Sequence, residues 1–280
     1  MLQKITVMGG VDKNGHPEPI RRLDIHPGEV LAVVGPTGAG KTQLIADIEQ
    51  YREGEAPTGR QVLIDGHPYA HDPLNPGPRH LVAEVSQKMN FIIDTTVEAF
   101  LARHARVRAI ASPETVINTV LTVANQLAGE PLSPTDNLTR LSGGQARALM
   151  VGDVALISNA PVVLVDEIEN AGIDRLSAMA ILSAHGKMVL VVTHDPTLML
   201  MAGRRVIMKN GGMHQLHRTT PAEIAIMETL AAREKDISRL RDTLRSGQQI
   251  TDNVPNKETQ ETWQAFYCTA RSTSAGRSAR

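Results

Sequence analysis

The sequence predicts an α/β protein whose core is a mainly parallel β-sheet sandwiched between helices. Several segments are unbroken runs of Val, Ile and Leu, which are typical of strands buried on both faces. Segments with helical spacing separate these runs, as crossover connections between parallel strands require. The expected strands are residues 2–8, 30–34, 62–64, 81–85, 162–165, 189–192 and 206–208.

This alternation is interrupted between residues 95 and 159, where the pattern is helical throughout. We expect helices at 97–107, 113–127 and 144–157 with no strand between them, which predicts a helical subdomain inserted in the sheet. Two crossover helices are expected elsewhere, at 42–51 and 174–184.

The predicted domain organisation has three parts. Residues 1–219 form the α/β domain, residues 220–246 a C-terminal helical extension, and residues 247–280 a flexible tail rich in Ser, Thr, Gln, Asn and Arg. The extension either packs on its own domain or contacts a partner, and the sequence leaves both alternatives open. Its apolar residues at roughly helical spacing are Ile224, Met227, Leu230, Ile237, Leu240 and Leu244.

Composition excludes several classes of protein. The 29 Lys and Arg residues nearly balance the 30 Asp and Glu residues, which argues against a nucleic-acid partner. Cys268 is the single cysteine, so the chain has no internal disulfide framework or thiolate metal cluster. No segment approaches the roughly 18 apolar residues of a membrane helix, and we expect a soluble, cytoplasmic chain.

Residues 35–42 match the phosphate-binding pattern GxxxxGK[ST] of a P-loop. The match follows an expected strand and precedes an expected helix, a context that disfavours a glycine-rich turn without a ligand. Glycines let backbone N–H groups surround phosphate oxygens, Lys41 can pair with the β- and γ-phosphates, and Thr42 can offer its hydroxyl to Mg²⁺. The predicted nucleotide-binding residues are Gly35, Pro36, Thr37, Gly38, Ala39, Gly40, Lys41 and Thr42.

The strand expected at 162–165 is followed by two carboxylates, Asp166 and Glu167. An aspartate at this end of a buried strand can hold Mg²⁺ through its water shell, and the next carboxylate can polarise an attacking water. Such a pair can also begin a solvated loop, but the P-loop upstream favours the catalytic interpretation. Kinases, GTPases and motor ATPases share these features. The features therefore predict an NTPase but do not distinguish between these classes.

The pentapeptide Leu-Ser-Gly-Gly-Gln at 141–145 distinguishes between these classes. With it, the chain resembles the ABC (ATP-binding cassette) ATPase family from about residue 2 to residue 216. The resemblance implies the P-loop NTPase fold of the ABC type, with an antiparallel β subdomain and an inserted helical subdomain beside the sheet. It also implies that a helix N-terminus contacts the γ-phosphate of ATP held by the P-loop of another subunit, through Ser142, Gly143, Gly144 and Gln145.

The resemblance implies two further site residues. Gln87 matches the Q-loop glutamine, which senses Mg²⁺ and links the nucleotide to the helical subdomain. His194 matches the switch histidine beside the γ-phosphate and attacking water. A lone glutamine or histidine is normally structural, and it is their order among five motifs that supports these roles. The implied catalytic residues are Lys41, Glu167 and His194, and the implied Mg²⁺-binding residues are Thr42, Gln87 and Asp166.

The resemblance implies an ATPase that uses ATP and Mg²⁺ and works as a head-to-tail dimer with a second, identical or paralogous, cassette. One role is the cytoplasmic ATPase subunit of an ABC transporter, bound to a membrane-spanning subunit at the inner face of the cell membrane. The alternative is a soluble ABC ATPase that remodels a cytosolic enzyme, cofactor or nucleic-acid complex. A regulatory cassette that binds nucleotide without hydrolysis is disfavoured by Glu167 and His194.

The sequence departs from the family pattern in three places, one of which is residues 146–153, where the family's arginine-rich pattern is absent. ABC cassettes usually carry an aromatic residue before the P-loop that stacks on adenine, whereas no Tyr, Phe or Trp precedes Gly35. Met8, Val11 or His16 would then pack against the base, and tolerance for GTP is a hypothesis. In the family, the segment after the acidic pair, called the D-loop, carries an aspartate. Asp174 corresponds to it and lies one residue later than usual. These departures indicate a divergent branch of the family.

Overall fold

The structure, a computed structural model, describes residues 2–49, 57–68, 81–86, 90–166, 168 and 172–249. Gln87, Glu167 and the expected tail beyond residue 249 therefore lie outside the described residues. Among the described residues, no helix combines the length and apolar character needed to span a bilayer.

A six-stranded sheet with the order β10-β9-β3-β8-β7-β6 forms the centre of the α/β domain. Five neighbouring strands are parallel, and β10 adds an antiparallel edge to β9. The strands are β3 (Val30–Val34), β6 (Val82–Ser86), β7 (Val162–Asp166), β8 (Met188–Val192), β9 (Arg204–Lys209) and β10 (Gly212–Arg218). The expected parallel core is thus confirmed.

A second, antiparallel sheet has the order β2-β1-β4-β5. Its strands are short: β1 (Ile5–Met8), β2 (Arg22–Ile25), β4 (Gln61–Ile64) and β5 (His67–Pro68). This sheet corresponds to the antiparallel β subdomain expected from the family resemblance.

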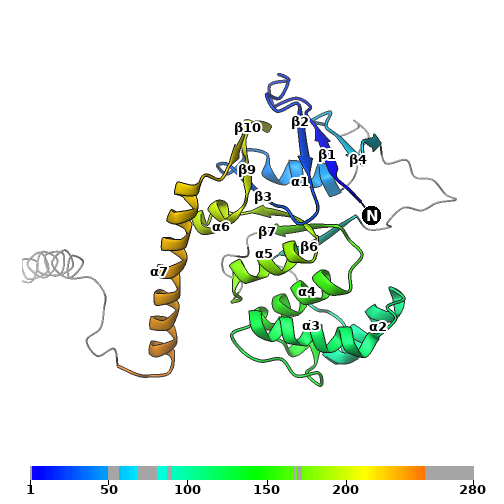
Figure 1. The fold of residues 1–280 in the computed structure, drawn as a ribbon, viewed down its shortest axis with the longest axis vertical. Helices are drawn as coiled ribbons and strands as arrows, with labels where there is room; N and C mark the ends of the chain where they lie inside the picture. The colour runs from blue at the N-terminus through cyan, green and yellow to red at the C-terminus, as the bar shows by residue number, and fades with distance from the viewer. Residues whose placement is uncertain are drawn as a thin grey trace, which may run out of the picture. The chain divides into compact units, whose positions relative to one another are not determined.

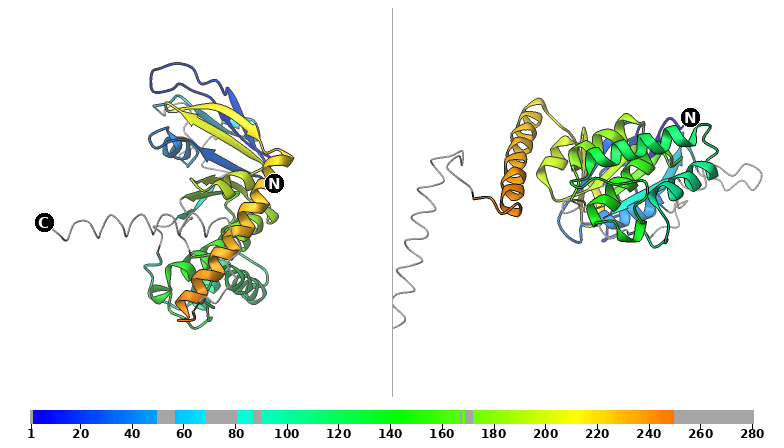
Figure 2. Two further views of the ribbon diagram at one scale, coloured as in Figure 1. Left: turned by 90° about the vertical axis from the view of Figure 1, so that its left-hand side faces the viewer. Right: turned by 90° about the horizontal axis from the view of Figure 1, so that it is seen from below.

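The two faces of the six-stranded sheet pack against different layers (Figures 1 and 2). Val163, Val165 and Val191 belong to an apolar cluster shared with the helices α2 (Val97–Val107), α3 (Pro113–Leu127), α4 (Gly143–Leu156) and α5 (Arg175–Ala184). Leu164 and Leu190, which alternate with them, belong to a second cluster shared with α1 (Lys41–Glu49) and the antiparallel sheet. Because successive side chains of a strand point to opposite faces, burial of both faces explains the unbroken apolar runs in the sequence.

Helices surround the sheet, and those between residues 90 and 161 follow one another without a strand. The helical layer contains α2 (Val97–Val107), α3 (Pro113–Leu127), a short 3₁₀ turn (Leu138–Arg140) and α4 (Gly143–Leu156). The remaining helices of the α/β domain are α1 (Lys41–Glu49), α5 (Arg175–Ala184) and α6 (Pro196–Met201). The helices that sequence spacing predicts at 97–107, 113–127 and 144–157 agree with the structure to within one residue.

The chain divides into two compact units, residues 1–228 and 229–280. The long helix α7 (Pro221–Arg245) begins in the first unit and continues into the second. Its start is fixed by a reciprocal pair of hydrogen bonds: the Thr220 backbone N–H donates to the Glu223 carboxylate, and the Glu223 N–H donates to the Thr220 hydroxyl. Such a capping box satisfies donors that a helix start otherwise leaves unpaired.

Candidate functional site

The parallel strands bring several predicted site segments to one edge of the six-stranded sheet. The P-loop follows β3, His194 lies two residues after β8, and Asp166 is the last residue of β7. Asp166 is in register with Val192 of β8 on one side and with Ser86 of β6 on the other. Because neighbouring strands lie about 4.8 Å apart, these strand ends are close enough to surround one ligand.

The P-loop turns sharply between β3 and α1. Gly35, Gly38 and Gly40 have φ angles of 152°, 77° and 98°, which residues with a side chain rarely adopt. A Cβ on Gly35 would lie 2.6 Å from the Met208 carbonyl oxygen, and one on Gly40 would lie 2.7 Å from Gly211 Cα. Two of these glycines are therefore required for close backbone packing as well as for the turn.

Lys41 is the first residue of α1 and is buried. Its Nζ donates hydrogen bonds to the carbonyl oxygens of Gly35, at 2.7 Å, and Pro36, at 3.3 Å. The next residue, Thr42, is exposed. A buried ammonium group, a turn of glycines and a helix N-terminus together form a strong site for phosphate.

Asp166 and His194 are both exposed at the same sheet edge. The residues on either side of His194 are well anchored. The backbone N–H of Asp195 donates to the Thr193 hydroxyl at 2.9 Å, and the Asp195 carboxylate accepts from Arg175 Nη1 at 2.6 Å. The histidine is therefore carried on a short segment that is fixed to α5.

The pentapeptide of residues 141–145, here called the signature, lies on the helical layer. Ser142 is the N-cap of α4, and its hydroxyl accepts from the Gln145 N–H while the Gln145 side chain accepts from the Ser142 N–H at 2.9 Å. Gln145 also donates to the Pro131 carbonyl oxygen at 2.9 Å. This capping box leaves the serine exposed at a rigid helix start.

The segment after β7 contacts the signature within the same chain. Gly172 has a φ of 69°, and a Cβ on it would lie 3.5 Å from Gly144 Cα. Asp174, the residue assigned to the D-loop, caps α5 by accepting from the Ser177 N–H at 3.1 Å. Its own N–H donates to the Leu127 carbonyl oxygen at 3.0 Å. The start of α5 is thus bonded to the end of α3.

Comparison with known proteins identifies the family. A family sequence model described as "ABC transporter" matches residues 21–170. The chain is also 45% identical over 250 residues to an uncharacterized ABC transporter ATP-binding protein of Methanocaldococcus jannaschii, which covers 89% of this chain and 95% of that protein. The chain belongs to the ABC transporter family. It is an ATP-binding and ATP-hydrolysing cassette, as its motifs predict.

Other relatives and solved structures agree with this cassette assignment. The chain is 31% identical to an ATP-dependent lipid A-core flippase of Chromobacterium violaceum over 69% of this chain, but spans only 34% of that protein. The structure of cbiO1 from Clostridium perfringens, described as part of an ABC transporter complex, has a TM-score of 0.58 at 18% identity and covers 86% of this chain and all of that one. A dimeric cassette bound to ADP and Pi has a TM-score of 0.56 at 22% identity, covering 77% and 99%. The predicted fold class is confirmed.

The cassette has a second cation at the P-loop that motif analysis does not predict. Lys13 lies in a turn of residues 12–15, and its Nζ donates to the Gly38 carbonyl oxygen at 2.7 Å. The turn is held in place by Asn210, whose carbonyl oxygen accepts from the Lys13 N–H at 2.9 Å and whose side chain donates to Asp12 at 3.1 Å. The sequence Asp-Lys-Asn-Gly signals a tight turn, but nothing local reveals its P-loop contact.

The three residues suggested to pack against the base lie before and after this turn in the sequence. Met8 ends β1, Val11 precedes the turn and the exposed His16 follows it. Val11 forms an isolated bridge with Pro17, which closes the loop. Packing of these residues against a base stays a prediction.

A buried ionic cluster supports the cassette's P-loop helix. Arg60 is fully buried and donates to the carboxylates of Glu18 and Asp47, the latter at 2.8 Å, and to the Gly211 carbonyl oxygen at 2.7 Å. Thr58 donates to the same Asp47 at 2.9 Å. Because Asp47 belongs to α1 and Gly211 to the turn between β9 and β10, one guanidinium group joins three parts of the fold.

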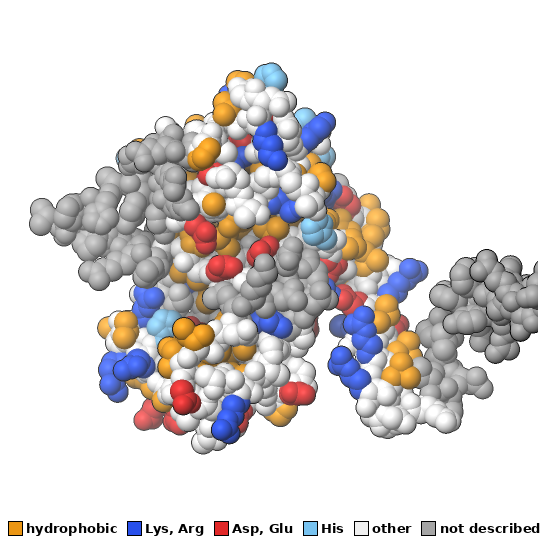
Figure 3. All heavy atoms as spheres, turned by 180° about the vertical axis from the view of Figure 1, so that it is seen from behind, with side chains coloured by type: hydrophobic (Ala, Val, Ile, Leu, Met, Phe, Trp, Pro, Cys, Tyr) orange, Lys and Arg blue, Asp and Glu red, His pale blue; other side chains and the backbone are white. Residues whose placement is uncertain are grey.

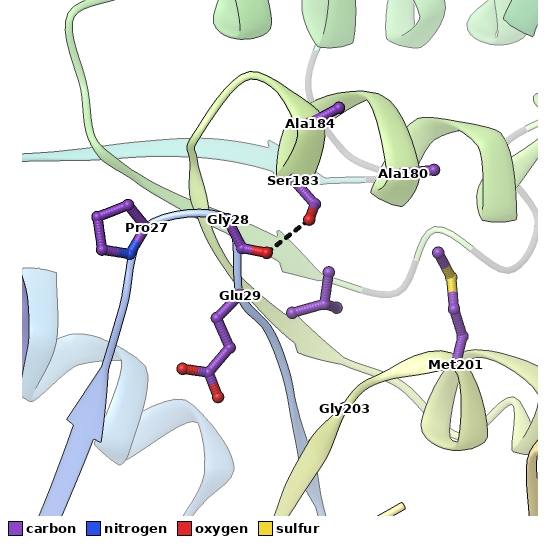
Figure 4. Close-up of a pocket in the computed structure, with 9 residues that line it drawn as sticks. Pro27, Gly28, Glu29, Ala180, Ser183, Ala184, Met201 and Gly203 are labelled. Atoms are coloured by element: carbon purple, nitrogen blue, oxygen red, sulfur yellow. Dashed lines mark hydrogen bonds between the residues drawn. The ribbon is translucent and has the colours of Figure 1, made fainter. Parts of the chain in front are cut away.

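A cavity of about 620 Å³ lies at the opposite end of β3 from the P-loop. Backbone and small side chains line much of it, and Ser183 donates to the Gly28 carbonyl oxygen across it (Figure 4). Its carboxylate, Glu29, already accepts from Arg204 and from the His26 N–H. The polar side chains of this cavity, Ser183 and Glu29, therefore already have hydrogen-bond partners within the protein.

Proposed function

We propose that the cassette binds ATP with Mg²⁺ at this sheet edge and that a second cassette completes the site with its signature. The supporting observation is the separation of the described motifs between layers. The P-loop, His194 and Asp166 follow neighbouring strands of the sheet, whereas Ser142 caps a helix of the helical layer. A phosphate chain bound by the P-loop would thus meet the signature serine of another copy.

Each residue of the proposed site has a distinct role. Lys41 and the P-loop N–H groups bind the β- and γ-phosphates, and Glu167 polarises the attacking water and receives its proton. His194 orients the γ-phosphate and that water. As the water attacks in line and the bond to the leaving ADP oxygen breaks, Lys41 and the second cassette's Ser142 stabilise the developing negative charge.

The residues at the edge fit a magnesium ion. Mg²⁺ is usually held by one or two protein oxygens together with phosphates and waters. Thr42, the second residue of α1, and Asp166, the last residue of β7, are exposed oxygen-bearing side chains, and Gln87 directly follows β6 in the sequence. No cluster of three or more His, Cys, Asp or Glu occurs among the described residues. When bound, the ion would be held by Thr42, Gln87 and Asp166 and would supply positive charge that offsets the negative charge of the phosphates.

The transporter role is supported by two neighbouring exposed isoleucines that follow Gln87 by five and six residues in the sequence, here called the apolar patch. Ile92 is 92% exposed and Ile93 49%, and the ring of Phe91 packs edge-on against that of Phe100 with the ring centroids 5.2 Å apart. An exposed patch of this kind marks an interaction site. We assign it to a helix of a membrane-spanning transporter subunit, which would hold the cassette at the cytoplasmic face of the membrane.

The alternative, a soluble ABC ATPase acting on a cytosolic complex, predicts a different partner for the same patch. Ile92→Asp should abolish co-purification of a membrane subunit from detergent extracts while leaving basal ATP hydrolysis unchanged. Ile224→Asp, which alters an exposed isoleucine on α7, is the matched control. Recovery of the wild-type chain only in the membrane-free fraction, with a soluble enzyme bound, would favour the alternative.

The site assignment is tested with Glu167→Gln. This variant should bind ATP, form a stable dimer in its presence and lose at least a hundredfold in turnover, because the attacking water is no longer polarised. Glu114→Gln, in the exposed first turn of α3, should behave like the wild type. Wild-type hydrolysis by Glu167→Gln would show that another group activates the water.

A further inference from the structure

Helix α7 carries an apolar seam with the spacing of a coiled coil. Five of its seven large apolar residues, together with Arg233, recur at alternating intervals of four and three residues. This alternation averages 3.5 residues, the repeat that keeps one narrow seam facing a partner helix in a left-handed supercoil. The seam comprises Ile226, Leu230, Arg233, Ile237, Leu240 and Leu244.

Three of the five apolar seam residues are exposed, and the other two, Leu230 and Leu240, are partly exposed. Ile226 is 53% exposed, Ile237 48% and Leu244 60%, although these are among the largest apolar side chains of the helix. Figure 3 shows hydrophobic and basic side chains on the surface of α7. At about 1.5 Å per residue, the 25 residues of α7 make a rod roughly 37 Å long. An exposed seam of this length is suited to another helix.

We propose that α7 pairs with α7 of a second copy of this chain as a parallel, in-register coiled coil. Charges beside the seam support this orientation. In a parallel pair, Asp236 of one helix lies opposite Arg241 of the other, the position at which interhelical ion pairs form. An antiparallel pair would instead bring Glu234 opposite Glu234 and Asp236 opposite Asp236, and like charges in these positions are repulsive.

The existing ion pair of Asp236 does not oppose this arrangement. Asp236 accepts from Arg239 of the same helix at 3.5 Å, with the two side chains 52% and 80% exposed. An exposed pair at this distance contributes little, so Asp236 can exchange it for Arg241 of the second copy.

Arg233 limits the strength of the pair. In the parallel arrangement the two Arg233 side chains meet at one layer of the seam, and a polar residue there fixes the register at a cost in stability. The seam is also under three heptads long. We therefore expect a weak pair that holds two cassettes near each other and raises the local concentration of each for the other. This pairing needs no nucleotide and does not depend on the proposed ATP site.

Disulfide trapping in the full chain tests the orientation. Cys268 is the only cysteine, so Cys268→Ser gives a cysteine-free background. Leu244→Cys should then form a disulfide-linked dimer under mild oxidation without nucleotide, because facing seam positions lie at disulfide distance. Ser238→Cys, on the outer side of α7, is the control and should not. Cross-linking only between Ile226→Cys and Leu244→Cys chains would show antiparallel helices and overturn the proposal.

Charge exchange tests the pairing itself, measured as the dimer dissociation constant by analytical ultracentrifugation without nucleotide. Asp236→Arg should weaken the dimer roughly fivefold to tenfold, since each of two symmetric attractions becomes a repulsion. Adding Arg241→Asp should restore it, because the opposite charges face each other again. A wild-type chain that is monomeric at every concentration, or a double variant as weak as the single one, would overturn the proposal.

Discussion

The ammonium group of Lys13 lies 2.7 Å from the carbonyl oxygen of Gly38. A residue of the connection between β1 and β2 therefore holds the backbone of the phosphate-binding loop. Lys41 binds the carbonyl oxygens of Gly35 and Pro36 in the same loop, so two lysines from distant positions restrain its backbone. This contact occurs in the stretch before Gly35, which contains no aromatic residue.

Lys13→Ala should raise KM for ATP about fivefold and leave kcat within twofold. The lost hydrogen bond to a charged donor is worth about 1 kcal/mol at an exposed site. Because Lys13 touches the loop rather than the reacting atoms, its loss should weaken the bound ground state and transition state equally. Steady-state kinetics with ATP and with GTP check this, and KM should rise by the same factor for both nucleotides.

Two matched variants complete this test. Lys13→Arg should recover most of the affinity, and Lys4→Ala, which removes a lysine just before β1, should have none of these effects. A fall in kcat with unchanged KM would contradict a role in holding the loop.

Gly40→Ala should destabilise the cassette more than Gly38→Ala. Both glycines have positive φ, with a strain of roughly 1–2 kcal/mol for alanine. A methyl group on Gly40 would also lie 2.7 Å from Gly211 Cα, whereas one on Gly38 would meet nothing within 4 Å. Urea unfolding of the two variants measures the difference. Equal free energies of unfolding would show that the β9–β10 turn moves to accommodate the methyl group at little cost.

Arg60→Met should lower the free energy of unfolding by about 3–5 kcal/mol, because the buried carboxylates of Glu18 and Asp47 would lose their counter-ion. Arg22→Met is the control, since Arg22 pairs with Asp24 at 3.0 Å with 54% of its side chain exposed. That variant should change stability by no more than about 0.5 kcal/mol. Similar losses in the two variants would contradict the importance assigned to the buried cluster.

Glu223 makes the start of α7 sensitive to acid. The hydrogen bond from Arg205, with that from the Thr220 N–H, lowers the pKa of Glu223 from 4.5 to about 2. A carboxyl whose pKa is lower in the folded state stabilises the fold fully above pH 4.5, and this contribution is lost as the pH falls towards 2. The stability difference between the wild type and Glu223→Gln should therefore shrink across this window. NMR titration of the Glu223 carboxyl checks the pKa, and a value near 4.5 would refute the prediction.

The features that the sequence predicts are those with a local cause. The run at 162–165 indicates a strand because both of its faces are buried, and Pro113 begins α3 because proline suits the first turn of a helix. Ser142 and Gln145, three residues apart, predict the start of α4. Motifs that follow neighbouring parallel strands also reach one sheet edge as a matter of topology.

The features that the sequence does not predict depend on distant partners. The expected strands do not include β2 and β10. β2 is only four residues long, although its apolar residues Leu23 and Ile25 do alternate with polar ones. In β10 the polar residues obscure any alternation of apolar side chains. The Arg60 cluster joins residues separated by 42 and 151 positions, and a buried arginine has no signature in its own neighbourhood. The contact of Lys13 is hidden for the same reason.

The bond between the start of α5 and the end of α3 has a mechanical consequence for catalysis. Asp166 ends a strand of the central sheet, while Ile173 bridges Ala128 at the end of α3 and Gly172 lies against the signature. Glu167 thus belongs to a span of only five residues whose two ends are attached to different layers. Any rotation of the helical layer against the sheet changes the length that this span must cover. The rate of ATP hydrolysis should therefore depend on the relative position of the two layers.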